Sequence, residues 1–210
     1  MVKLTDLVAV AVLGYVGVQL VRATSMSLRR GAPTWEILRG LRWRHFALAV
    51  PVLAGVLAVG IPLMSLPVLS WGWWTAIGGV GNPVFGTTDT TTGSPLTIVI
   101  PVVFMVLLVL GLPILVLSEE WIFRRGAQRR SVVGNAAWSI LFGLAHALIG
   151  IPVGAALALS VGGGYLTWRY LRGWRATGTE EGALRESARS HLAYNLVILA
   201  AVALTFAAGW

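Results

Sequence analysis

The chain has 210 residues, of which 57% are hydrophobic and 11% are charged, and its formal net charge is +8. Soluble domains carry about 25% charged residues, so this composition excludes a soluble globular protein, and its apolar content excludes a disordered chain. The lack of cysteine excludes disulfides, thiolate metal sites and cysteine nucleophiles, and the basic excess of so apolar a chain indicates a membrane surface and no nucleic acid.

Apolar stretches long enough to cross a bilayer recur along the whole chain. A membrane-spanning helix needs about 20 predominantly apolar residues, and six stretches reach or approach that length. In chain order they cover residues 4–21, 46–69, 96–117, 132–149, 152–171 and 188–208. We therefore predict an all-α fold, a polytopic membrane helix bundle of about six transmembrane helices.

Tryptophans flank the second stretch, as is typical of a membrane–water interface. Before it, residues 29–44 predict a short surface helix that turns Trp35 and Trp43 toward lipid. His45, at the edge of this basic segment, is predicted to be an interface residue. After the second stretch we expect an aromatic interface belt and then a flexible loop. The belt comprises Trp71, Trp73 and Trp74.

Only Gly150-Ile151-Pro152 separates the fourth stretch from the fifth. Glycine readily ends a helix and proline readily begins one, so this segment predicts a tight helical hairpin. On the fifth stretch, small residues recur every four positions at Gly154, Ala158 and Gly162. Such a stripe allows close approach of two helices, and we predict that it packs against a neighbouring helix of the same chain.

Basic residues are concentrated in alternate connecting segments. Residues 22–44, 118–131 and 169–189 hold 15 of the 16 basic residues, whereas residues 70–95 and 150–152 hold none. Cytoplasmic loops carry the excess of lysine and arginine in membrane proteins, so we place these three segments in the cytoplasm and both termini outside. The expected location is the plasma membrane of a prokaryote, with membrane lipids as partners.

Four ionisable side chains lie within or directly beside apolar stretches: Glu119, Glu120, His146 and His191. Such groups are costly inside a membrane and mark functional sites. From the helical rise per residue, Glu119, His146 and His191 lie about 15, 20 and 18 Å from the cytoplasmic ends of their helices. We therefore expect one carboxylate and two imidazoles to meet in a cavity that opens to the cytoplasm.

Residues four apart share one face of a helix, which pairs the polar residues of this region. Glu120 and Arg124 are expected to form an ion pair, while Glu119 points about 100° away, toward the cavity. The same spacing separates two further pairs, His191 from Asn195 and Phe142 from His146. The phenylalanine of the second pair is expected to form an apolar wall.

Three motifs occur in order, each on an apolar helix. Glu119-Glu120-Trp121-Ile122-Phe123-Arg124 fits E-E-x-x-x-R, Phe142-Gly143-Leu144-Ala145-His146 fits F-x-x-x-H, and His191-Leu192-Ala193-Tyr194-Asn195 fits H-x-x-x-N. Together they resemble the CPBP (Abi) family of intramembrane proteases, which includes type II CAAX prenyl endopeptidases and bacteriocin-processing or immunity proteins. The resemblance covers residues 96–208. Arg125 stands where a glycine commonly follows the motif arginine, and Gly126 comes one position later.

The resemblance divides the chain into two parts. Residues 1–95 form two amino-terminal membrane helices with a basic cytoplasmic loop and an outer loop, and residues 96–210 form a CPBP-like catalytic helix bundle. The implied activity is hydrolysis of a peptide bond by a glutamate-activated water. Glu119 would act as general base, with His146 helping to orient and activate the water. The oxyanion donors would be His191 and Asn195, and the frame, or contacts to substrate backbone, would come from Glu120 and Arg124.

The family is also often described as a metalloprotease family. Glu119, His146 and His191 offer three ligands for a zinc ion, and catalytic zinc favours three protein ligands and a water. The sequence lacks the zinc motif H-E-x-x-H. We therefore favour a metal-free mechanism, with no firmly predicted cofactor and with a divalent metal such as zinc as the alternative.

Two other functions are compatible with these residues. A non-catalytic member would use the same bundle for immunity, scaffolding or partner binding, and a small transporter would use a protonatable Glu/His site. Against the transporter, the sequence shows no pair of broken helices. A scaffold has no need of a base, a helper and oxyanion donors together. We therefore expect an intramembrane endopeptidase that cuts a membrane-associated peptide or protein near the cytoplasmic face.

Overall fold

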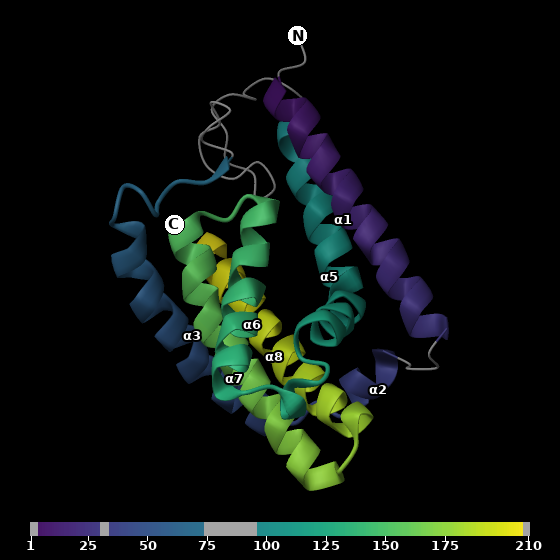
Figure 1. Ribbon diagram of the computed structural model, residues 1–210. Helices are drawn as coiled ribbons and strands as arrows, with labels where there is room; N and C mark the ends of the chain where they lie inside the picture. Colours follow the sequence, from purple (N-terminus) through teal and green to yellow (C-terminus); the bar gives the residue numbers. More distant parts are fainter. Residues whose placement is uncertain (1–3, 30–33, 74–95, 208–210) are drawn as a thin grey trace.

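The computed structural model of the chain is a bundle of helices and describes residues 4–29, 34–73 and 96–207 (Figure 1). Its α-helices are α1 (Leu4–Arg29), α2 (Thr34–Arg39), α3 (Trp43–Met64), α5 (Leu96–Phe123), α6 (Val132–Ala145), α7 (Val153–Thr177) and α8 (Glu180–Ala207). Two short 3-10 helices, η1 (Ala127–Arg129) and η2 (His146–Ile149), follow α5 and α6. The predicted all-α fold is confirmed over these residues.

Some of these helices are long and apolar enough to cross a membrane. Within the described ranges the candidate spans are Trp43–Met64, Val102–Arg129, Val132–Ile149 and Glu180–Leu204. They match the second, third, fourth and sixth predicted stretches. α1 contains a shorter apolar segment, Val10–Ser25, and glycine, aromatic and basic residues make α7 less apolar. The helical bundle is thus confirmed, and four of the six expected spans meet this criterion.

α7 packs against three other helices of the bundle, α3, α6 and α8. Its small residues allow this close approach. A Cβ atom at Gly154 would lie 3.1 Å from backbone atoms of Leu63 and Leu69. Ala158 is fully buried in an apolar cluster with Val56 of α3. The small-residue stripe of α7 therefore packs within the chain, as predicted.

The predicted hairpin between α6 and α7 is present. Gly150 ends η2 with a φ of 92°, a left-handed conformation that glycine adopts readily, and Pro152 directly precedes α7. Beside this hairpin, α1 and α5 lie side by side, and α5 also contacts α8 (Figure 1). The structure thus brings the carboxyl-terminal part of α5 into contact with the helices that carry the other two motifs.

The tryptophans predicted at the interfaces have different surroundings. The predicted surface helix is α2, which is shorter than expected and contains Trp35, whereas Trp43 is the first residue of α3. Both side chains are exposed, Trp43 by 80%. Beyond α3, Trp71 is half-exposed and Trp73 is half-buried. Trp74 and the predicted flexible loop lie outside the described residues.

His45 lies inside the bundle and not at an interface, so the prediction for this residue is wrong. Its side chain is fully buried, and its Nδ1 accepts a hydrogen bond from the backbone N–H of Arg42 at 2.9 Å. Its Nε2 lies 3.6 Å from Oε1 of Glu186, which Arg44 and Arg169 also contact. The side chain of His45 can be buried because the Glu186 carboxylate of α8 gives the imidazole a polar partner where α3 contacts α8. The same carboxylate also pairs with two arginines.

Candidate active site

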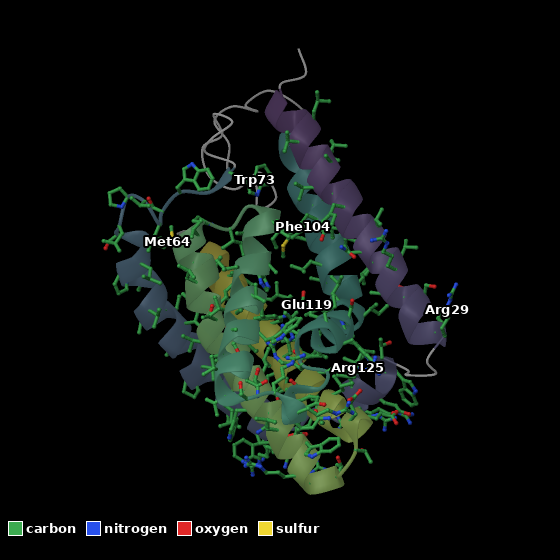
Figure 2. All side chains as sticks on the ribbon, viewed as in Figure 1. Arg29, Met64, Trp73, Phe104, Glu119 and Arg125 are labelled. Atoms are coloured by element: carbon green, nitrogen blue, oxygen red, sulfur yellow. The ribbon has the colours of Figure 1, made fainter. Side chains whose placement is uncertain are left out.

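Side chains of two motifs meet where α5 contacts α8. Nε2 of His191 lies 3.5 Å from Oε2 of Glu119, and Nδ1 of the same ring lies 2.9 Å from Oε1 of Glu120. Figure 2 shows Glu119 in the interior of the molecule, between the ribbons of α5 and α6. One imidazole of α8 therefore joins both glutamates of the first motif.

Glu120 is fully buried and is held by several polar contacts. Its carboxylate contacts Nδ1 of His191 and Oγ of Ser187, and Nε of Arg124 lies 3.9 Å from Oε2. Oγ of Ser187 also lies 2.9 Å from the carbonyl oxygen of Leu166 on α7. The expected pair of Glu120 and Arg124 is thus one part of a larger network that fixes the carboxylate in position.

The partners of His191 define which ring nitrogen carries a proton. An ionised carboxylate only accepts hydrogen bonds, so Nδ1 of His191 donates to Glu120. Nε2 then faces Glu119 with a lone pair in the neutral ring, or with a second proton in the imidazolium ring. In the imidazolium form, Nε2 is a donor for an oxygen atom placed beside Glu119.

The two adjacent glutamates differ in their access to solvent. The Glu120 side chain has no exposed surface, whereas 34% of the Glu119 side chain is exposed. This difference arises because consecutive residues of a helix point about 100° apart. A water molecule can reach the Glu119 carboxylate, while Glu120 is available only to its protein partners.

His146 lies at the end of α6, where the chain changes to the 3-10 turn η2. Its Nδ1 lies 2.9 Å from the carbonyl oxygen of Phe142, and because a carbonyl oxygen only accepts, Nδ1 carries a proton; in the neutral ring Nε2 then has the lone pair. The Phe142 ring contacts the His146 ring edge-to-face at 5.0 Å between centroids and the His191 ring at 5.5 Å. Phe142 is thus the expected apolar wall, and it touches both imidazoles.

Asn195 lies one helical turn beyond His191 on α8 and is half-buried. Its side-chain amide makes no hydrogen bond to any other residue that the structure describes, which leaves its donors available to a ligand.

Arg124 is fully buried, and its guanidinium lies 4.5 Å from the centre of the Phe142 ring. Arg124 therefore combines a cation–π contact with its ion pair to Glu120.

The turn after α5 forms although its glycine, Gly126, stands one position later than the sequence resemblance predicts. Gly126 adopts a φ of 75°, the left-handed conformation that glycine favours. Nη1 of Arg130 donates to the carbonyl oxygen of Phe123 at 2.8 Å and thereby satisfies the end of α5. Arg125 is exposed, and its Nε donates to Oε1 of Glu180 at 2.7 Å. The shifted glycine leaves the turn intact.

The alternative zinc site was tested on the arrangement of its donors. In the part of the chain that the structure describes, no group of three or more His, Asp or Glu side chains is arranged to hold a metal ion. Glu119 and His191 are close together, but His146 is joined to His191 only through the Phe142 ring. The residues present therefore do not fit a zinc ion.

Ser187 is a site residue that sequence reasoning missed. It is fully buried, and its hydroxyl contacts the carboxylate of Glu120. The sequence spacing could have revealed it, because Ser187, His191 and Asn195 follow one another at intervals of four residues. These three side chains therefore follow one face of α8.

Comparisons of the chain with protein-family models, with curated proteins and with solved structures give no significant match.

Proposed function

We propose that the chain is an intramembrane endopeptidase of the CPBP class, which hydrolyses a peptide bond of a membrane-associated peptide or protein. The observation that carries the proposal is the contact of one imidazole, His191, with two adjacent glutamates that differ in burial. A purely structural cluster has no need to leave Glu119 partly exposed. It also has no need to leave the amide of Asn195 without a hydrogen bond to the described residues.

Glu119 is the proposed general base. Its carboxylate takes a proton from a water molecule, and the hydroxide attacks the carbonyl carbon of the scissile peptide bond. The carbonyl π electrons move to the oxygen, which becomes the oxyanion of a tetrahedral intermediate. When the intermediate collapses, the carbon–nitrogen bond breaks and the proton held by Glu119 passes to the leaving nitrogen. The carboxylate is then restored.

The other polar residues stabilise the negative charge that develops on the substrate oxygen or orient the groups that take part. The imidazolium Nε2 of His191 and the amide of Asn195 donate to the oxyanion, an interaction that is strong where water is excluded. Glu120, on the opposite nitrogen of His191, fixes the orientation of the ring. The Nε2 lone pair of His146 accepts a hydrogen bond from the water and orients it.

The proposed topology is a six-span bundle with cytoplasmic access to the site. α1 and α7 have 26 and 25 residues, and their length of about 38 Å is enough to cross a hydrocarbon core of about 30 Å. Ion pairs of Arg44 with Glu186 and of Arg125 with Glu180 join the basic ends of α3, α5 and α8. By the positive-inside rule, the proposed orientation has this end in the cytoplasm and both termini outside, and the proposed membrane is that of a prokaryotic cell.

Cleavage by the purified full chain in liposomes tests the proposed function. A library of membrane peptides is incubated with the wild-type chain and with Glu119→Gln, and the products are identified by mass spectrometry. We expect defined peptide products from the wild-type chain and none from the variant. Peptides that bind the wild-type chain and stay intact would instead favour the non-catalytic scaffold or immunity protein.

A further inference from the structure

Trp73 follows α3 and is far in sequence from the proposed catalytic residues, yet it contacts the segment that carries one of them. Its indole Nε1 donates a hydrogen bond of 2.9 Å to the carbonyl oxygen of Ala147. Ala147 is the residue directly after His146, within the 3-10 turn η2. Figure 2 shows Trp73 near the upper end of α6, on the side of Phe104.

The indole ring also packs against the helices on the other side of the site. Val12 and Val16 of α1 form a buried apolar cluster with Phe104 of α5, and both Trp73 and Ile149 pack against it. Ile149 is the last residue of η2. Trp73 therefore connects the α1–α5 pair with the short turn that begins at His146.

The backbone next to Trp73 contacts the start of α7, a few residues after η2. The backbone N–H of Val153 donates to the carbonyl oxygen of Trp71 at 3.0 Å, and that of Gly154 donates to the carbonyl oxygen of Leu69 at 2.7 Å. The segment from Leu69 to Trp73 thus runs along the hairpin between α6 and α7. Because of these contacts, the side chain of Trp73 has a fixed position relative to η2.

We propose that Trp73 is a positioning residue for His146, an inference that rests on the proposed function. Short 3-10 turns have poorer hydrogen-bond geometry than α-helices, so an external donor on their carbonyl groups matters more. The His146 ring is held by the carbonyl oxygen and the ring of Phe142. The backbone next to His146 is held by the hydrogen bond from Trp73 to Ala147. The two restraints together fix the position of the His146 Nε2.

Histidine NMR tests this restraint without any need for activity. The chain contains three histidines, and the 15N resonances of the full-length labelled protein in detergent can be assigned by replacing each in turn. We expect Trp73→Phe, which keeps an aromatic ring but removes the N–H donor, to shift or broaden the His146 signals and to leave those of His45 and His191 in place. Trp71→Phe is the matched control, because Trp71 contributes its carbonyl group and its side chain is half-exposed.

Unchanged His146 signals in Trp73→Phe, or signals of all three histidines that move together, would overturn the proposal. Kinetics provide the second measurement. We expect the kcat of Trp73→Phe for a cleaved peptide to fall about tenfold with KM nearly unchanged, because small displacements of catalytic groups are costly. A wild-type kcat in this variant would also overturn the proposal. If the wild-type chain cleaves nothing, the proposed function fails, while the NMR result still decides whether Trp73 positions His146.

Discussion

The imidazole of His191 bridges Glu119 and Glu120, with Nδ1 2.9 Å from the buried carboxylate and Nε2 3.5 Å from the partly exposed one. Neighbouring residues with the same side chain thus share one partner, although they lie in different environments. Glu120 is enclosed and fixed by several contacts, whereas Glu119 remains accessible to water.

Glu120→Gln is expected to destabilise the protein more than Glu119→Gln. The substitution removes the negative charge next to the buried guanidinium of Arg124 and the anionic acceptor of His191. Breaking a buried ion pair costs about 3–5 kcal/mol of the free energy of unfolding. Thermal melting of the two variants in the same detergent checks this expectation, and equal losses in Tm would contradict it.

Ser187→Ala is expected to lower stability, because it removes the hydroxyl that contacts the Glu120 carboxylate and the carbonyl oxygen of Leu166. Leaving buried polar groups without a partner costs about 1–3 kcal/mol. Ser160→Ala is the matched control, since the Ser160 hydroxyl is buried and has no hydrogen-bond partner among the described residues. Denaturant unfolding should show a loss only for Ser187→Ala. A similar loss in both variants would mean that the network around Glu120 is not the cause.

Glu186→Gln is expected to weaken the contact of α8 with α3 and α7. Arg169 is 2% exposed and depends on this carboxylate, which Arg44 and His45 also face. Glu181→Gln serves as the control, because 69% of the Glu181 side chain is exposed and its pair with Arg185 lies within one helix. Exposed pairs contribute about 0–1 kcal/mol, so only Glu186→Gln should lower Tm by several degrees. A Tm loss in Glu181→Gln as large as in Glu186→Gln would be inconsistent with this account.

Cleavage is expected to be insensitive to metal removal. Glu119, His146 and His191 do not form a three-ligand metal group in the described structure, and the proposed chemistry uses only protein groups and water. The rate is measured before and after dialysis against a strong chelator. Loss of activity that added zinc restores would show that cleavage requires a metal ion, and the metal-free mechanism would then be wrong.

Spacing along single helices predicted one contact of the candidate site. The four-residue interval placed Arg124 beside Glu120, and the structure contains that pair. The closer partner of Glu120 is His191, 71 positions away. This contact depends on which faces of α5 and α8 pack together, and no local pattern contains that information. The same limit explains His45, whose polar partner Glu186 lies on a different helix.

Hydropathy predicted the all-α fold, but α7 is less apolar than the helices that meet the criterion for a membrane span. α7 packs against three other helices through small residues, so it contains glycine where an isolated span would contain leucine. Its apolar character is therefore weak although it has the length of a span. Trp73 shows a related limit. Tryptophans at the end of an apolar stretch are typical of an interface belt, and only the fold reveals that this indole donates to Ala147.

The cleavage rate of Glu119→Gln, measured with its Tm, tests the central claim most directly. Glutamine has nearly the shape of glutamate but cannot take a proton from water, and among the described residues Glu119 makes a single ion pair. We therefore expect the rate to fall at least about 100-fold, with a Tm close to that of the wild-type chain. A folded Glu119→Gln variant that cleaves peptides at the wild-type rate would contradict the assignment of Glu119 as the general base.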